Sequence, residues 1–236
     1  MQTRLNSIKK DLQAESDPLK KKGLSRFFKT GKGEYGEGDI FLGVTVPKIR
    51  RVAKKYKDVS LDEIRTLLRS LIHEERLTAL LILVENFRKA DETEKTEIFN
   101  LYLKNTKYIN NWDLVDLSAS RIVGEFLKDK PVDILYTLAK SKSLWERRIA
   151  IISTFQFIWE GRFAETLKIS KILLTDRHDL IHKAVGWMLR EVGKRSFKTE
   201  EGFLKKHYKK MPRTMLRYSI EKFPEKLRLR YLTGVV

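Results

Sequence analysis

A tryptophan and an aspartate stand four residues apart in the stretch NWDLVDLSASR, residues 111–121. If this stretch is helical, Trp112 and Asp116 lie one above the other on the same face, so the indole and the carboxylate border the same volume. A carboxylate is costly to bury unless it is paired. We therefore expect another chemical group to occupy that volume. Arg148 is the obvious partner in the chain, and a plain structural ion pair is an alternative interpretation.

A second set of residues combines an aromatic ring with cations. Lys183 and Trp187 are four residues apart, and Trp187 and Arg190 are three apart, so all three share one helical face. Aromatic surfaces interleaved with Arg and Lys are typical of nucleic-acid grooves, because phosphates need charge and sugars or bases need flat apolar contact. Core packing is the alternative for each indole, and it is our expectation for Trp145 and Trp159, which lie among Ile, Phe and Leu.

A glycine-rich stretch, TGKGEYGEG, contains a literal G-x-G-x-x-G pattern at Gly31, Gly33 and Gly36. The preceding SRFFK resembles a helix, and no parallel strand or phosphate-binding helix flanks the pattern, so a dinucleotide site is not predicted. We expect a flexible loop whose acidic residues repel phosphate. These acids are Glu34, Glu37 and Asp39.

The stretch HDLIH places His178 and His182 four residues apart, which mimics half of a zinc peptidase site. Asp179 and not a glutamate directly follows the first histidine, and Leu180 and Ile181 come next, so the water-activating glutamate is absent and we predict a solvated histidine pair and no metal site.

The composition is globular and strongly basic. The 236 residues include 49 Lys and Arg against 31 Asp and Glu, a net charge of +18, which favours a polyanion such as nucleic acid as the partner. The alternatives are a charge that only maintains solubility, or binding to an anionic membrane. There is no cysteine, which excludes disulfides and thiolate metal sites. MQTRLNSIKKDLQ lacks the apolar core of a signal peptide, and Leu77 to Val84 is too short to span a bilayer, so we expect a soluble intracellular protein.

Helix signals recur along the chain, whereas alternating strand patterns are nearly absent, and we predict an all-α fold. Capping boxes are predicted at Ser60 with Glu63, Asp91 with Glu94 and Ser143 with Glu146. First-turn positions are expected for Pro47, Pro131 and Pro212.

An internal repeat of roughly 35 residues is also present. Its segments are EERLTALLILVENF, NNWDLVDLSASRIVG, LWERRIAIISTFQF and LIHKAVGWMLREVG, each preceded by a shorter amphipathic helix. Helical-hairpin repeats of this kind stack into a curved solenoid in which equivalent positions line one concave surface. We therefore expect Trp112, Asp116, Arg148, Lys183 and Trp187 to come together along a basic groove.

The same segments resemble the AlkD-type DNA alkylation-repair glycosylases, which are built from HEAT-like repeats. The resemblance spans nearly the whole chain and is carried by FLGVTVPKIRR at 41–51, NWDLVD at 111–116, LWERRIAI at 144–151 and HKAVGWMLRE at 182–191. It implies one glycosylase domain over residues 1–236 that hydrolyses the glycosidic bond of N3- or N7-alkylated purines, such as 3-methyladenine and 7-methylguanine, in duplex DNA. The family is thought to act without rotating the base into a pocket.

The resemblance also implies roles for individual residues. Asp116 would be the catalytic carboxylate, Arg148 its partner, and Trp112 and Trp187 the aromatic walls around the sugar of the damaged nucleotide. DNA contacts are expected from Lys183, Arg190, Arg147 and Thr45. We expect no metal, no cofactor and no membrane partner, a monomer, and a bacterial cytoplasmic location that is nucleoid-associated when DNA is bound.

An alkylated purine that carries a positive charge is already a good leaving group, so one carboxylate can suffice to stabilise the oxocarbenium-like sugar. Two other functions remain open. One is a non-catalytic helical-repeat scaffold that binds nucleic acid through charge, and the other is an adaptor whose acidic protein partner uses the groove.

Overall fold

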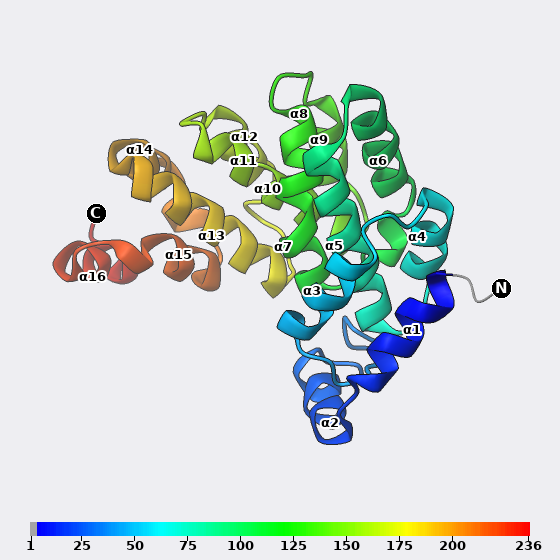
Figure 1. The fold of residues 1–236 in the computed structure, drawn as a ribbon. Coiled ribbons are helices and arrows are strands. Elements are labelled where there is room, and N and C mark those ends of the chain that lie inside the picture. The colour runs from blue at the N-terminus through cyan, green and yellow to red at the C-terminus, as the bar shows by residue number, and fades with distance from the viewer. Residues whose placement is uncertain (1–3) are drawn as a thin grey trace. The chain divides into compact units, whose positions relative to one another are not determined.

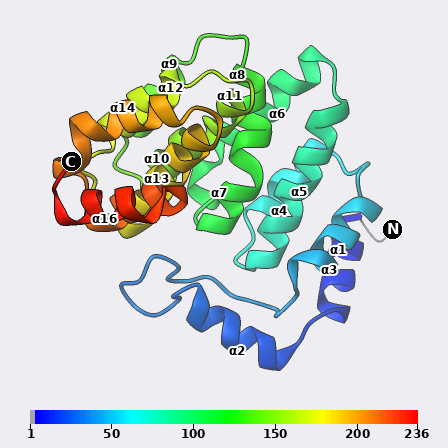
Figure 2. The same cartoon turned by 90° about the vertical axis from the view of Figure 1, so that its left-hand side faces the viewer.

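The computed structural model describes residues 4–236 and is all-helical (Figures 1 and 2). In this part of the chain no strand forms, and an isolated bridge links Ile40 to Ile72. The predicted fold class is therefore confirmed. The chain divides into two compact units, unit 1 up to Ser118 and unit 2 from Ala119 to Val236. The single domain over residues 1–236, the solenoid and its basic groove remain predictions.

Unit 1 is organised around one long buried helix. Its helices are α1 (Arg4–Ala14), α2 (Pro18–Phe27), α3 (Val46–Lys55), α4 (Leu61–Leu68), α5 (His73–Lys89), α6 (Glu92–Lys104), a short 3₁₀ turn (Thr106–Tyr108) and α7 (Trp112–Ala119). Helix α5 is buried on every face from His73 to Val84, and its part from Leu77 to Val84 is apolar almost throughout, as expected for a buried helix. Helices α3 and α4 pack directly against α5, and both views show α4 beside it.

Unit 2 also has a long central helix, α13. Its elements are a π-helical turn (Ser120–Gly124), α8 (Glu125–Leu127), α9 (Asp133–Ala139), α10 (Leu144–Ser153), α11 (Phe155–Trp159), α12 (Ala164–Ile172), α13 (Asp179–Arg195), α14 (Phe197–His207), a 3₁₀ turn (Tyr208–Lys210), α15 (Arg213–Ser219), a second 3₁₀ turn (Ile220–Lys222) and α16 (Glu225–Thr233). Helices α10, α14 and α15 pack on α13. Helix α15 approaches α13 closely at Gly186, where a Cβ atom would lie 2.5 Å from the Cβ of Tyr218.

The predicted repeat segments all fall on helices. The first lies in α5, the second begins at α7, the third covers α10 and α11, and the fourth lies in α13. In three cases the shorter preceding helix packs on the longer one, namely α4 on α5, α9 on α10 and α12 on α13. These pairs have the helical-hairpin connectivity that the repeat predicts.

Local sequence signals explain where several helices begin. The capping boxes of Ser60 with Glu63 at α4 and of Asp91 with Glu94 at α6 both form and are confirmed. Pro47 occupies the first turn of α3, also as predicted.

Three other start signals were only partly right. The hydroxyl of Ser143 accepts the Glu146 amide hydrogen at 3.4 Å, but the Glu146 carboxylate bonds the Ser141 hydroxyl instead of completing the box. Pro131 and Pro212 lie just before α9 and α15, outside the first turns that we predicted for them.

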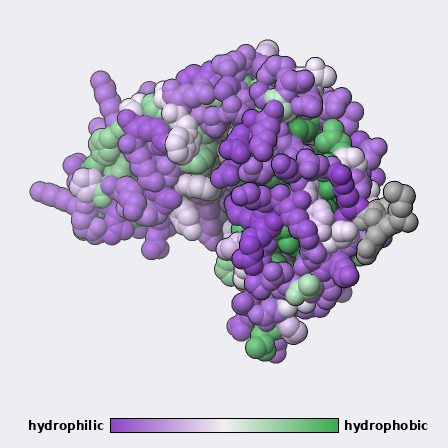
Figure 3. All heavy atoms as spheres, in the orientation of Figure 1, coloured by the Kyte–Doolittle hydropathy of each residue, from purple (hydrophilic) through white to green (hydrophobic). Residues whose placement is uncertain are grey.

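The face shown in Figure 3 is mostly hydrophilic, in keeping with the net charge of +18. Hydrophobic side chains appear on it singly or in small groups, which is ordinary for a folded protein surface. Within residues 4–236, no helix combines the length and the apolar character needed to cross a membrane.

Candidate functional site

Trp112 and Asp116 share the volume that their spacing predicts. Both lie on α7, both are half-buried, and both line one cavity of about 640 Å³ in unit 1. Thr45, which precedes the first turn of α3, lines the same cavity. The structure therefore brings together three of the predicted site residues, which come from segments more than 60 residues apart.

Two phenylalanines at the end of α2 hold the indole of Trp112. The ring of Phe28 stacks on it, with centroids 5.2 Å apart and planes inclined by 18°, and the ring of Phe27 meets it edge-on at 5.8 Å. Phe28 stacks in turn on Phe41 at 5.0 Å. Aromatic contacts of this kind fix a ring's orientation as well as contributing packing energy. The indole is thus a rigid wall of the cavity and is not sealed in the core.

The cavity is mainly apolar around a single half-buried carboxylate. Besides the aromatic rings, its lining includes the aliphatic side chains of Leu24, Val44, Val46, Ile49, Leu77 and Leu117. Asp116 is half-buried, whereas the acids Asp113 and Glu74, which also border the cavity, are buried. In such surroundings a carboxylate interacts with a cationic group more strongly than it would in water. The cavity is therefore suited to stabilise positive charge next to a flat aromatic surface.

Thr45 occupies the N-cap position of α3, but its hydroxyl makes no capping hydrogen bond. The start of a helix presents unsatisfied N–H groups, which together with a free hydroxyl can bind a phosphate oxygen. This geometry is compatible with the predicted DNA contact.

Sequence reasoning missed a buried charged group in the wall of this cavity. His73, at the start of α5, lies between the carboxylates of Asp39 and Asp113, at 3.1 and 2.8 Å. Arg76 donates to the other oxygen of Asp39 at 2.6 Å. The prediction that Asp39 is a loop acid that repels phosphate is wrong, because Asp39 is 8% exposed and paired inside unit 1.

A signal for this charged group was present in the sequence. The run HEER, residues 73–76, directly precedes the stretch Leu77 to Val84, which is apolar almost throughout. A helix that has no polar face must be buried on all sides. The charged residues in the first turn of the same helix are then buried as well, and buried charges have to be paired.

In unit 2, Arg148 and Trp187 also have well-defined surroundings. Arg148, on α10, is 5% exposed and donates to the backbone carbonyl of Leu180. Trp187, on α13, is half-buried, and its indole N–H donates to the Glu191 carboxylate at 3.2 Å. The ring of Phe155 lies 5.8 Å from it. The second predicted indole, like the first, is therefore only partly covered within its unit.

The three predicted DNA-binding cations of unit 2 all take part in ion pairs. Lys183 pairs with Asp179 at 2.6 Å, and Arg190 pairs with Glu221. Arg147 is held more firmly, because it pairs with Asp176 at 2.6 Å and also donates to two backbone carbonyls, those of Ser141 and Lys142. Lys183 is the most exposed of the three. The pair of Lys183 and Asp179 is exposed, and exposed pairs contribute little to stability, so a phosphate can replace Asp179 at small cost.

Of the two tryptophans that we expected in the core, Trp145 is buried, as predicted, but Trp159 is 64% exposed. The helical run breaks at Thr154, between α10 and α11, so the spacing used to place Trp159 does not continue through it. The Arg195 guanidinium lies over the exposed ring, 5.2 Å from its centroid.

The glycine-rich segment forms a loop of turns, in which two backbone N–H groups that could bind a phosphate already donate to carboxylates. The N–H of Gly31 is bonded by Glu34 at 2.9 Å, and that of Gly33 by Glu37 at 2.8 Å. Exclusion of a dinucleotide site is consistent with this arrangement.

The two histidines of HDLIH are each bonded to the backbone around the start of α13. His178 caps the start of α13 by accepting the Leu180 N–H at 3.2 Å, whereas His182 bonds the carbonyl of Asp176. In the described part of the chain, no cluster of three or more His, Asp or Glu residues could hold a metal ion.

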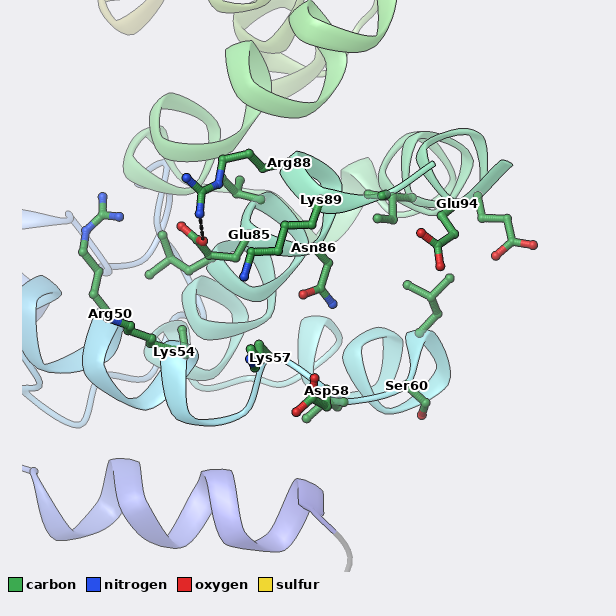
Figure 4. Close-up of a pocket in the computed structure, with 18 residues that line it drawn as sticks. Arg50, Lys54, Lys57, Asp58, Ser60, Glu85, Asn86, Arg88, Lys89 and Glu94 are labelled. Carbon is green, nitrogen blue, oxygen red and sulfur yellow. Dashed lines mark hydrogen bonds and ion pairs between the residues drawn. The ribbon is translucent and has the colours of Figure 1, made fainter. Parts of the chain in front are cut away.

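Unit 1 contains a second cavity of about 870 Å³ between the ends of α3 and α5 and the start of α6 (Figure 4). Arg50, Lys54 and Lys89 reach its rim, and Arg88 is paired with Glu85 at 3.2 Å. None of the predicted site residues lies there. Although it is larger, this cavity has mixed charge and no aromatic wall, so the cavity at Asp116 is the candidate site.

Comparisons with known proteins identify the family of the chain. The sequence profile of the DNA alkylation repair enzyme family matches residues 8–223. Two solved structures resemble the fold. One is described as a predicted DNA alkylation repair enzyme from Enterococcus faecalis, with a TM-score of 0.68 and 16% identity over 89% of this chain and 98% of that one. The other is smu.31 from Streptococcus mutans UA159, with a TM-score of 0.53 and 20% identity over 87% of this chain and 100% of that one.

At these identities the two structures support the fold alone. No curated protein sequence matches the chain. The family profile, in contrast, covers most of the sequence and both units. The chain therefore belongs to the family of DNA alkylation repair enzymes.

Proposed function

We propose that this protein is a monofunctional DNA glycosylase of the AlkD type, which hydrolyses the N-glycosidic bond of cationic N3- or N7-alkylated purines in duplex DNA. The observation that carries the proposal is the shared cavity of Thr45, Trp112 and Asp116 in a member of a DNA alkylation repair family. A basic chain with a net charge of +18 is suited to bind the phosphate backbone.

The chemistry assigned to Asp116 follows from the charge of the substrate. The alkylated purine departs as a neutral base, so it needs no general acid. Breaking the bond leaves positive charge on C1′ of the sugar, which a carboxylate in an apolar cavity can stabilise, and the same carboxylate can orient the attacking water. The half-buried position of Asp116 allows contact with a sugar while limiting its hydration.

The indole of Trp112 adds a flat surface for the deoxyribose. Its face attracts the developing positive charge through cation–π interaction, and Phe27 and Phe28 hold it in a fixed orientation. A base that stays stacked needs no deep base-specific pocket, which fits the proposal that the lesion is not rotated out of the duplex.

Arg148 and Trp187 are assigned to the same reaction on the sequence motifs LWERRIAI and HKAVGWMLRE. In this proposal Arg148 keeps Asp116 ionised and Trp187 forms a second aromatic wall. Lys183, Arg190, Arg147 and Thr45 are proposed to contact phosphates.

The test is release of free base from duplex DNA that contains 7-methylguanine, with protein in excess so that one turnover is followed. We expect release by the wild type and a loss of about 100-fold or more in Asp116→Asn, because the variant keeps the shape of the side chain but not its charge. Asp129→Asn, at an exposed carboxylate, is the matched control and is expected to act like the wild type. The strand should remain intact until alkali is added, because no lysine nucleophile is proposed.

Each outcome has a definite meaning. If the wild type releases no base but binds DNA in a salt-sensitive manner, the non-catalytic scaffold replaces the glycosylase. Full release by Asp116→Asn would remove the mechanism. Arg148→Met added to Asp116→Asn tests the partnership, since Arg148 loses its effect once its proposed partner is neutral.

A further inference from the structure

Four ionisable side chains, two of which border the cavity, form a buried group that the proposed mechanism does not use. Asp39, His73, Arg76 and Asp113 are each at most 8% exposed. They come from three places in unit 1, namely the loop before α3, the first turn of α5 and the first turn of α7. Buried charges are costly unless they are paired and hydrogen-bonded, so each of them is expected to be held in a fixed geometry.

The contacts of the imidazole define its protonation state. Nδ1 of His73 lies 3.1 Å from Asp39 Oδ2, and Nε2 lies 2.8 Å from Asp113 Oδ2. Ionised carboxylates only accept hydrogen bonds, so both ring nitrogens must carry a proton for the two contacts to form. His73 is therefore an imidazolium that bridges the two acids.

The pKa of His73 agrees with this geometry. Burial lowers it, but the charge of Asp113 and the hydrogen bonds to Asp113 and Asp39 outweigh burial, and the pKa rises from 6.5 to about 8. Arg76, whose guanidinium lies 2.6 Å from Asp39, opposes the rise. The other charged groups nearby on α5 are already engaged, since Glu75 pairs with Lys9 at 3.4 Å and Glu74 accepts backbone N–H groups.

Both neighbours of Trp112 in the sequence are anchored to this group. Asn111 accepts the Trp112 N–H at 2.9 Å and donates to Asp39 at 3.1 Å. Asp113 accepts the Leu114 N–H at 2.9 Å with one oxygen and bonds His73 with the other. The first turn of α7 is thus tied on both sides of the indole.

The loop that leads to Thr45 is fixed by the next residue of α5. The carboxylate of Glu74 accepts the backbone N–H groups of Leu42, Gly43 and Val44, at distances of 2.8 to 3.2 Å. Gly43 has a φ of +90°, a conformation that other residues rarely adopt. His73 and Glu74 therefore hold the two segments that border the cavity.

We propose that His73 is a positioning residue, which fixes the first turn of α7 by bridging Asp39 and Asp113 and so sets the positions of Trp112 and Asp116. Its role in the reaction rests on the function proposed above, because His73 acts through Asp113 and not on the substrate. The positioning itself can be measured without any reaction.

The experiment replaces His73 by Gln and labels the protein with 5-fluorotryptophan. The chain has four tryptophans, so four fluorine signals are expected, and Trp112→Phe identifies the one from Trp112. We expect His73→Gln to shift or broaden the Trp112 signal and leave that of Trp145 unchanged. Base release is expected to fall about 10-fold to 100-fold in the single-turnover rate, with little change in DNA affinity, because misplaced catalytic groups slow the chemistry itself.

Two further variants keep the test decisive. Asp113→Asn removes one charge from the bridge at constant volume, and it is expected to move the Trp112 signal if His73→Gln fails to fold. His207→Gln, on α14 in unit 2, is the matched control for loss of a histidine and is expected to leave both the signal and the rate unchanged.

The outcomes separate the inference from the proposed function. If the Trp112 signal moves but the wild type releases no base, positioning stands and the glycosylase proposal fails. If the wild type releases base and both variants keep the wild-type signal and rate, the positioning role is overturned while the function stands. A fall in stability without a change in rate or signal would also overturn it, because His73 would then only support the fold.

Discussion

Deprotonation of His73 is expected to lower the free energy of unfolding as the pH rises. The folded protein holds this proton up to a pH of about 8, whereas an unfolded histidine releases it near 6.5. The stabilisation is therefore fully present below pH 6.5 and is lost as the pH rises through 8. A pKa difference of this size corresponds to about 2 kcal/mol, because one pKa unit is worth about 1.4 kcal/mol.

The assay is urea unfolding of the wild type and His73→Gln, followed by circular dichroism at several pH values between 5.5 and 9.5. The difference in the free energy of unfolding between the two proteins isolates the histidine, since contributions from other groups are common to both. We expect this difference to shrink by about 2 kcal/mol across the range. A constant difference, or one that grows with pH, would refute the assignment of an imidazolium at this position.

His207→Gln supplies a control of opposite sign. Burial and the charges of Lys171, Lys206 and Lys210 lower the pKa of His207 in the folded protein. An unfolded histidine then binds its proton more readily, so this contribution to stability is lost as the pH falls. The two histidine variants should therefore change the pH dependence in opposite directions.

Three other changes test the packing and the ends of individual helices. Burial raises the pKa of Glu200 from 4.5 to about 9, so the contribution of Glu200 to the free energy of unfolding falls as the pH rises from 4.5 through 9. Glu200→Gln is therefore expected to raise the melting temperature at pH 7 and to weaken the dependence of stability on pH between 4.5 and 9. Gly186→Ala is expected to destabilise the protein by about 1 to 3 kcal/mol in urea unfolding, because the new Cβ would lie 2.5 Å from Tyr218. The control is Gly202→Ala, at a helical position with open space around it, which is expected to be neutral or stabilising. Ser60→Ala removes a capping box and is expected to cost about 1 kcal/mol in the same measurement; no loss would mean that the box does not stabilise α4.

The features that the sequence predicted well are local ones. A capping box depends on residues three apart, so Ser60 with Glu63 and Asp91 with Glu94 could be identified directly. Ser143 shows the limit of such signals, because Ser141 competes for the carboxylate of Glu146. The all-α class could be predicted for the same reason, since helix periodicity and helix caps depend only on residues that are close in the sequence.

The candidate site could be predicted in part. Helical spacing predicted that Trp112 and Asp116 border the same volume, and both line a single cavity. The buried group was missed because it joins residues 34 and 40 positions apart, and no local pattern links Asp39 and Asp113 to His73. Trp159 was misplaced because an interruption between two short helices changed the helical phase.

The two aspartates of NWDLVD lie in different environments, which suit them to different roles. Asp113 is buried against an imidazolium, and with Arg76 and Asp39 the group contains two positive and two negative charges. Such a balanced group leaves no net charge to repel Asp116, which stands three residues later at the cavity. One carboxylate can therefore hold the helix in place, while the other borders the cavity, where it is proposed to stabilise positive charge on a substrate.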